Sequence, residues 1–241
     1  SLYYPGTEKE DCVSMFCLKD VTKVYRKRQQ HVLAFRADHL NISPGEYVAV
    51  VGPSGSGKTT FLSILGGMLS PDAGTVVFDG SSLYDLPVAE RTKRRCEQIG
   101  FVFQTFNLVP YLTALENVSL PLYLRGLTPS AHRSRAIKLL EKVGLGDRLD
   151  HKPCELSTGQ QQRVALARTL ANNPRVILAD EPTGNLDPDS REGVLTLFEE
   201  FVREGRTIVM VTHDLVAAQR VQRRLHLQDG QIVDPLQPPL A

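Results

Sequence analysis

The sequence predicts an α/β fold: a parallel sheet core, an N-terminal antiparallel β-subdomain and an inserted helical subdomain. Three observations lead to this prediction. Short runs that are apolar on both faces occur at 46–52, 176–180 and 207–213, as is typical of buried parallel strands. Two segments of alternating apolar and polar residues precede them. Between about 83 and 170 the pattern becomes mainly helical, so the sheet is expected to be interrupted there.

The remaining elements follow in chain order. The alternating segments 13–25 and 31–43 read as half-buried strands, with polar residues 26–30 as the turn between them. Amphipathic spacing in 130–145 places Ala136, Leu139, Leu140 and Val143 on one stripe of a helix. Further segments with clear signals are a helix at 58–69, a turn at 70–74, a strand at 75–80 and a helix at 189–205.

Composition restricts the class of protein. The 241 residues are 41% hydrophobic and 23% charged, which is ordinary for a globular domain. A formal net charge of +1 argues against a nucleic-acid partner. No apolar run approaches the ~20 residues of a membrane span, and the first residues lack a secretory signal pattern, so we expect a cytosolic protein without direct membrane insertion. Four cysteines without metal-ligand spacing are expected to be free thiols: Cys12, Cys17, Cys96 and Cys154.

A glycine-rich stretch, GPSGSGKT at 52–59, lies between an apolar strand and a helix. Its small residues allow successive backbone N–H groups to converge on phosphate oxygens. Lys58 can reach the outer phosphates, and the Thr59 hydroxyl can bind Mg²⁺. A plain glycine turn before a helix is the structural alternative. The expected nucleotide-binding residues are Gly52, Pro53, Ser54, Gly55, Ser56, Gly57, Lys58, Thr59 and Thr60.

Two adjacent carboxylates close the apolar strand 176–180. Asp180 ends the strand, so its carboxylate is expected at the carboxyl edge of the sheet, where it can hold Mg²⁺ directly or through water. Glu181 points elsewhere and can orient or deprotonate a hydrolytic water. An acidic strand-to-turn junction without chemistry is common for an isolated Asp-Glu pair, but the phosphate loop makes the catalytic interpretation much stronger.

A second anion site is suggested by CELSTGQQQRVALARTL at 154–170. Ser157, a threonine and a glycine precede good helix formers, and a helix N-terminus favours an anion because its first N–H groups are unpaired. The alternative is that Ser157 only caps its own helix.

The order of these motifs resembles that of the ATP-binding cassette (ABC) ATPases. The phosphate loop is followed by Gln104 in FVFQ, by LSTGQ at 156–160, by ILADE and by His213 in VMVTHD. The resemblance covers almost the whole chain and implies one ABC ATPase domain over 1–241. It implies a catalytic core at about 13–100 and 171–235, a helical subdomain at about 101–170 and a flexible tail at 235–241.

By this resemblance the chain hydrolyses ATP with Mg²⁺ and pairs head-to-tail with a second copy. Ser157, Gly159 and Gln160 would meet ATP held by the partner's phosphate loop, and Asp187 in GNLD would lie in the loop that crosses between the copies. Thr158 replaces the glycine usual in the family, which would be strained if that position needs a positive φ.

Three single residues take roles from the same resemblance. Gln104 would bind Mg²⁺ and sense the γ-phosphate, and His213 would hydrogen-bond that phosphate. Tyr25 would stack on adenine through its flat ring. Without the family context, His213 would read as a structural histidine and Tyr25 as a core tyrosine at the end of a strand.

The sequence between the motifs, and the number of phosphate loops, indicate which branch of the family the chain resembles. The interval 105–155 lacks the long coiled coil of chromosome-maintenance relatives, and one phosphate loop excludes the tandem translation-linked type. QTFNLVPYLTALENVSLPL at 104–122 and EPTGNLD at 181–187 resemble the lipoprotein-release, macrolide-efflux and cell-division branch. This implies an ATPase on the cytoplasmic face of a membrane that drives integral permease subunits. The candidates for contact with those subunits are Phe106, Leu108, Val109 and Tyr111, and ordinary packing inside the helical insertion is the alternative.

Two alternatives of other classes are weighed beside that reading. An ATP-dependent clamp or regulatory protein would bind nucleotide with little turnover. A small-molecule kinase with a phosphate loop would have no use for LSTGQ or His213.

Overall fold

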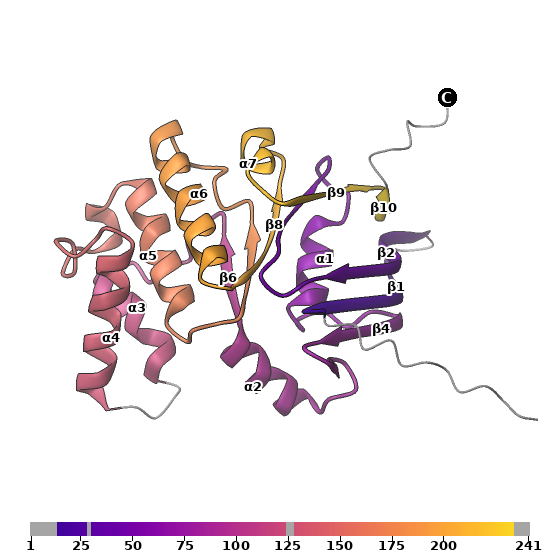
Figure 1. Cartoon of the computed structure of the whole chain (residues 1–241), viewed down its shortest axis with the longest axis horizontal. Coiled ribbons are helices and arrows are strands. Elements are labelled where there is room, and N and C mark those ends of the chain that lie inside the picture. The colour runs from indigo at the N-terminus through magenta and orange to yellow at the C-terminus, as the bar shows by residue number, and fades with distance from the viewer. Residues whose placement is uncertain (1–13, 28–29, 124–127, 234–241) are drawn as a thin grey trace, which may run out of the picture.

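One mixed sheet runs through the described part of the protein, which comprises residues 14–27, 30–123 and 128–233 of a computed structural model. Its ten strands lie in the order β5-β4-β1-β2-β10-β9-β3-β8-β7-β6 (Figure 1). The strands are β1 Phe16–Lys27, β2 Gln30–Ile42, β3 Tyr47–Val51, β4 Ala73–Phe78, β5 Ser81–Ser82, β6 Ile99–Phe103, β7 Val176–Asp180, β8 Thr207–Thr212, β9 Arg223–Gln228 and β10 Gln231–Val233.

The N-terminal half of the sheet is antiparallel, as the alternating sequence predicts. β1 pairs with β2 and with β4, and Phe16 lies opposite both Ile42 and Phe78. The predicted turn at 26–30 is too long, because β1 extends to Lys27 and β2 already begins at Gln30. Residues 28–29 lie outside the described part.

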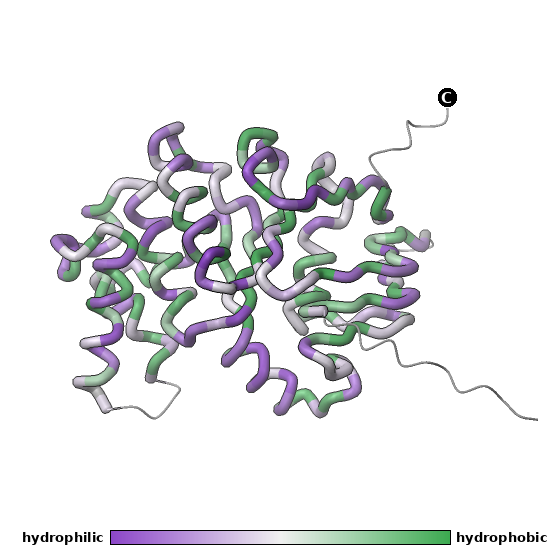
Figure 2. The backbone as a smooth tube through the Cα atoms, viewed as in Figure 1, coloured by the Kyte–Doolittle hydropathy of each residue, from purple (hydrophilic) through white to green (hydrophobic). Residues whose placement is uncertain are grey.

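The other half is built on parallel strands, of which β3, β7 and β8 are buried on both faces. β3 pairs in parallel with β8 and β9, and β7 joins β8 to β6. Alternate residues of β3 enter two different cores: Val48 and Val50 pack beside helix α1, whereas Tyr47 and Ala49 pack with the long helix α6. This double burial explains why the strand is apolar at every position, and Figure 2 shows the same central strands in green.

The helices surround this sheet and gather beyond one end of it (Figure 1). α3, α4 and α5 form the helical part, and α5 also packs against α6. The bounds are α1 Lys58–Leu65, α2 Val88–Gln98, α3 Ala114–Tyr123, α4 Pro129–Lys142, α5 Thr158–Leu170, α6 Pro188–Arg203 and α7 Leu215–Gln219, with a 3₁₀ turn at Pro153–Glu155.

Two sequence boundaries require correction. Residues 101–103, assigned to the helical part, belong to β6, which forms the edge strand beside β7. The helix expected at 58–69 ends at Leu65, because Gly66 and Gly67 follow and Gly67 takes a positive φ of 66°. The stripe expected on α4 is buried at Ala136, Leu140 and Val143 and partly buried at Leu139.

The structure also bears on the expectations for the cysteines, the C-terminal tail and membrane-spanning helices. Cys17, Cys96 and Cys154 form no disulfide bond among the described residues, whereas Cys12 and the tail 235–241 lie outside the described part. Within the described ranges, none of the helices has the length and apolar character that crossing a bilayer requires.

Candidate nucleotide-binding and catalytic site

The carboxyl ends of neighbouring parallel strands meet at one cleft. β3 leads into the phosphate loop and α1, β6 ends before Gln104, β7 ends at Asp180, and β8 ends before His213. The cleft has a volume of about 850 Å³. Its lining residues are Ser54, Gly55, Gly57, Lys58, Thr59, Thr60, Phe103, Gln104, Thr105, Asp180, Glu181 and His213.

The phosphate loop is seated by backbone contacts that exclude side chains. A Cβ at Gly57 would lie 2.1 Å from the Ala34 carbonyl oxygen, and one at Gly52 would lie 2.1 Å from the Leu227 carbonyl oxygen. Gly57 also has a φ of 105°, which L side chains rarely adopt. The two glycines are therefore required by the neighbouring strands β2 and β9 as well as by any phosphate in the loop.

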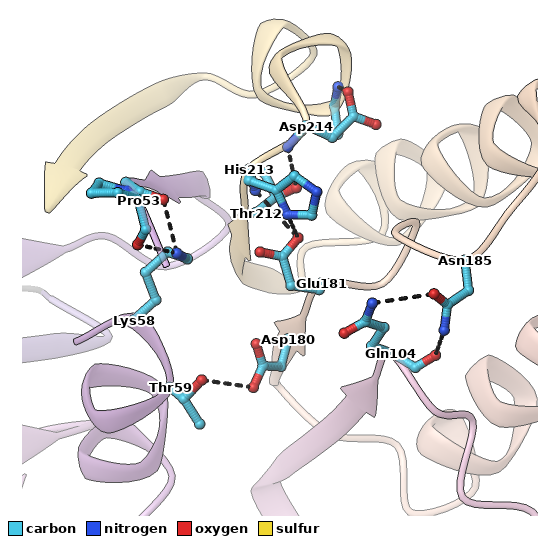
Figure 3. A network of polar contacts seen from close by, with 12 residues as sticks. Pro53, Lys58, Thr59, Gln104, Asp180, Glu181, Asn185, Thr212, His213 and Asp214 are labelled. Atoms are coloured by element: carbon cyan, nitrogen blue, oxygen red, sulfur yellow. Dashed lines mark hydrogen bonds and ion pairs between the residues drawn. The ribbon is translucent and has the colours of Figure 1, made fainter. Parts of the chain in front are cut away.

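Lys58 is buried at the base of this loop (Figure 3). Its ammonium group donates to the carbonyl oxygens of Gly52, at 2.8 Å, and Pro53, at 2.9 Å. These two acceptors orient the positive charge along the loop. An anion in the loop would meet the same ammonium group together with the N–H groups at the start of α1.

Asp180 lies beside the start of α1. The Thr59 hydroxyl donates to Asp180 Oδ2 at 3.2 Å. Burial, followed by the charge of Glu181, raises the pKa of Asp180, while the Thr59 hydrogen bond and Lys58 oppose this shift. A carboxylate that is desolvated next to a second carboxylate gains from a cation, and the hard oxygens of Thr59, Asp180 and Gln104 suit Mg²⁺. The donor set therefore fits the ion implied by the family.

Glu181 is turned away from Asp180 by its own backbone. Its φ of 47° is left-handed, which is unusual for a residue with a side chain. Its Oε2 atom lies 2.9 Å from His213 Nδ1 and accepts a 3.2 Å hydrogen bond from the His213 backbone N–H. Figure 3 shows the two side chains facing each other over the cleft. The two side chains are in direct contact, and because both line the cleft, the Glu181 carboxylate can orient a water there.

Asp214 fixes the loop that carries His213. Its carboxylate caps α7 by accepting from the N–H groups of Val216 and Ala217, at 2.8 and 3.3 Å. Arg191 of α6 reaches its other oxygen at 3.3 Å. The sequence analysis missed this residue, although an Asp directly before a short helix is itself a capping signal.

Gln104 has a partner that the sequence did not indicate. Its side-chain N–H group donates to Asn185 Oδ1 at 3.2 Å, and the Asn185 amide donates to the Gln104 carbonyl at 3.3 Å. Asn185 belongs to the loop between β7 and α6. Phe103 and Thr105, which flank Gln104, also line the cleft and were not singled out.

The remaining predicted residues lie outside this cleft. Tyr25 is on β1 and is 46% exposed, and Asp187 caps α6 by accepting from the Ser190 N–H group. Within the phosphate loop, Gly52, Pro53 and Ser56 support the lining residues without facing the cleft. The residues expected at a partner's nucleotide, Ser157, Gly159, Gln160 and Asp187, are all absent from the lining of the cleft, and so is Tyr25, which was expected at the chain's own adenine.

The LSTGQ segment begins α5 in a capping box. Ser157 Oγ accepts from the Gln160 N–H group, and the Gln160 side chain accepts from the Ser157 N–H group, at 3.2 and 2.9 Å. Thr158 is the first helical residue and is absent from the residues with positive φ, so its branched side chain is not strained. A Cβ at Gly159 would lie 2.2 Å from Ser190 Oγ, so glycine permits the close approach of α5 and α6.

The family is established by comparison with known proteins. Residues 35–184 match the family model described as ABC transporter. The uncharacterized ABC transporter ATP-binding protein MJ0796 of Methanocaldococcus jannaschii is 48% identical over 223 residues, which cover 90% of this chain and 95% of that protein. The chain therefore belongs to the ABC transporter family, as an ATP-binding domain of the ATPase class.

Two named relatives and a solved structure add detail. The lipoprotein-releasing system ATP-binding protein LolD of Pseudomonas fluorescens is 46% identical over 89% of this chain and 95% of its own. The macrolide export ATP-binding/permease protein MacB of Syntrophobacter fumaroxidans is 47% identical over 90% of this chain but only 31% of that longer protein. A dimeric, post-hydrolysis structure of MJ0796 with ADP and Pi matches with a TM-score of 0.84 at 45% identity, covering 91% and 97% of the two chains.

Proposed function

We propose that two copies of this chain bind two Mg-ATP molecules between them and use closure and hydrolysis to drive membrane permease subunits. The observation that supports this most directly is the division of the site. The phosphate loop, Asp180, Glu181 and His213 line one cleft, while the capped N-terminus of α5 lies outside it. A second copy in head-to-tail orientation would bring its Ser157 to the γ-phosphate, and the matched MJ0796 structure is itself dimeric.

In this proposal each residue has a limited task. Lys58 and the loop N–H groups hold the phosphates, and Thr59, Asp180 and Gln104 hold the ion. Mg²⁺ bound by these residues would supply positive charge to neutralise the phosphates. Glu181 orients a water for in-line attack on the γ-phosphorus, and His213 donates to a γ-phosphate oxygen. Tyr25 stacks on adenine and Asp187 lies at the contact between copies.

The membrane partner is proposed to dock beside the loop that follows Gln104. Tyr111 is 73% exposed there, whereas Leu108 packs against the helical core and is a weaker candidate for contact. Phe106 and Val109 are half-buried. The names of LolD and MacB support a lipoprotein-release or export system on the cytoplasmic face of a membrane.

The test of the sandwich is Glu181→Gln, which removes the charge that orients water but keeps an acceptor for His213. We expect ATP binding to persist, turnover to fall at least a hundredfold, and a dimer to accumulate on addition of Mg-ATP in sedimentation velocity. Glu200→Gln on α6 is the matched control and should hydrolyse ATP at the wild-type rate without accumulating a stable dimer. A monomeric Glu181→Gln protein at saturating Mg-ATP contradicts the proposal.

A clamp or regulatory protein with negligible turnover is the second candidate, favoured by the likeness to the cell-division branch. Phosphate release with and without the membrane subunits separates the two. Stimulated turnover supports transport work, while low turnover that is unchanged by the subunits supports the clamp.

A further inference from the structure

The loop after Gln104 contains two consecutive left-handed residues. Phe106 and Asn107 have φ values of 42° and 50°, and neither is glycine. Asparagine tolerates this region better than most residues, but an aromatic side chain does not. A strained pair of this kind persists only where the surroundings hold it. Gln104, two residues earlier, lies in the catalytic cleft.

One side chain holds both residues. Arg168, in the last turn of α5, donates from Nη2 to the Phe106 carbonyl at 2.7 Å and from Nη1 to the Asn107 carbonyl at 2.6 Å. The planar guanidinium group matches two neighbouring acceptors in a way that a lysine ammonium group cannot. Burial lowers the pKa of Arg168, although an arginine remains charged at neutral pH. The charge is therefore partly withdrawn from water where it makes these two contacts.

Arg168 also links the Ser157 end of α5 to the loop that follows Gln104. α5 begins at Thr158, directly after the Ser157 cap, and Arg168 follows eleven positions after that cap, about 16 Å along a helix. An α-helix of this length transmits a displacement of one end to the other with little bending. A shift of the Ser157 end would thus be felt by the carbonyls of Phe106 and Asn107.

We propose that Arg168 is a positioning residue that clamps the left-handed pair Phe106–Asn107, so that Gln104 moves together with α5. The proposal rests on the function proposed above for Gln104 and Ser157. It assigns Arg168 no contact with nucleotide. Arg168 affects turnover only through the loop that carries Phe106 and Asn107. Relieving the backbone strain at Asn107 should therefore reduce the loss of turnover caused by removing Arg168.

The experiment compares Arg168→Met, Arg168→Lys and the double variant Arg168→Met/Asn107→Gly. Methionine keeps an apolar stem but removes both donors, so we expect kcat to fall at least tenfold while KM for ATP changes less than threefold. Lysine keeps the charge but offers a single ammonium group, so the kcat of Arg168→Lys should lie between those of the wild type and Arg168→Met. Glycine adopts φ near 50° without strain, so the double variant should recover at least threefold of the lost kcat.

A readout that does not depend on ATP accompanies the kinetics. Amide hydrogen exchange in segment 104–109 should quicken in Arg168→Met and slow again in the double variant, with β6 and the start of α5 unchanged. Arg203→Met on α6, whose side chain is 68% exposed, is the matched control and should leave both kcat and exchange unaltered. The thermal stability of each variant is recorded so that general unfolding is recognised.

The outcomes are distinguishable. Unchanged exchange in Arg168→Met, or a kcat loss that Asn107→Gly does not relieve at all, overturns the clamp. If Gln104→Ala hydrolyses ATP at the wild-type rate, the function proposed for Gln104 fails, while the exchange measurement still decides whether Arg168 holds the loop.

Discussion

Glu181 and Asp180 are adjacent in sequence yet serve different parts of the cleft, and a single backbone angle separates them. The left-handed φ of 47° directs Glu181 towards His213 while Asp180 faces Thr59. Such a conformation costs about 1–3 kcal/mol for a residue with a side chain, and its persistence here places strain at the proposed chemical step. The sequence could predict both carboxylates from the strand end, but not this angle, which depends on the packing around His213.

Asp180 should reduce the stability of the nucleotide-free protein. Burial raises its pKa, so the folded state binds the proton more tightly than the unfolded state does. The destabilisation is present at neutral pH and disappears as pH falls through the raised pKa towards the ordinary value of an aspartate. We expect Asp180→Asn to increase the free energy of unfolding by on the order of 1 kcal/mol at pH 7 while abolishing turnover.

Denaturant unfolding at pH 7 and at about pH 4 checks this expectation. The difference between Asp180→Asn and the wild type should shrink at the lower pH. A variant that is less stable than the wild type at pH 7 would show that the Thr59 hydrogen bond outweighs desolvation.

Lys58 carries the charge at the base of the phosphate loop. Its replacement by alanine removes charge-assisted contacts worth about 1.5–3 kcal/mol, so ATP binding should weaken by roughly tenfold to a hundredfold. Isothermal titration calorimetry measures the change, with Lys93→Ala on the exposed face of α2 as control. Equal affinities for Lys58→Ala and wild type would remove Lys58 from nucleotide binding.

Helix α5 illustrates what can be read at the scale of an element. The sequence indicated its N-terminal cap, and the reciprocal contacts of Ser157 and Gln160 agree with that signal. Its C-terminal contact with Phe106 and Asn107 spans more than sixty residues of sequence, so no local pattern could have revealed it.

A matched pair of substitutions at Ser157 separates capping from phosphate contact. Asparagine and aspartate cap helices about as well as serine does, so both variants should keep the stability of the monomer within about 0.5 kcal/mol. Aspartate would place a negative charge against the partner's γ-phosphate, and we expect Ser157→Asp to lose turnover at least tenfold more than Ser157→Asn. Steady-state phosphate release measures this ratio, and equal rates would leave Ser157 with capping alone.

Strands differ in how well their sequences reveal them. β3, β7 and β8 were evident because both faces are apolar, whereas β9 and β10 were not identified individually. β9 reads RRLHLQ, which lacks an apolar run, and β10 has only three residues. Both are held in the sheet by their pairing, β9 with β3 and β10 with β9. β6 was read as the start of the helical part because Gln104, its functional neighbour, lies at that boundary.

At the scale of the whole molecule, one copy presents each half of the proposed site on a different surface. Turnover should then depend on the concentration of protein as well as of ATP. Well below the dimer dissociation constant at saturating Mg-ATP, the rate is expected to rise with the square of protein concentration. A constant specific activity over a hundredfold dilution, in the absence of membrane subunits, would mean that a single copy is sufficient.

The backbone contacts that hold the phosphate loop affect which positions of this domain can vary in evolution. Because Gly52 and Gly57 rest against carbonyl oxygens of Leu227 and Ala34, the junction is made of main chain on main chain. Replacing side chains of β2 and β9 leaves those carbonyls in place, so the sequences of these two strands can change without disturbing the loop. The two glycines have no such freedom, and tolerance of mutation should therefore fall abruptly, within a few residues, from the flanking strands to the loop itself.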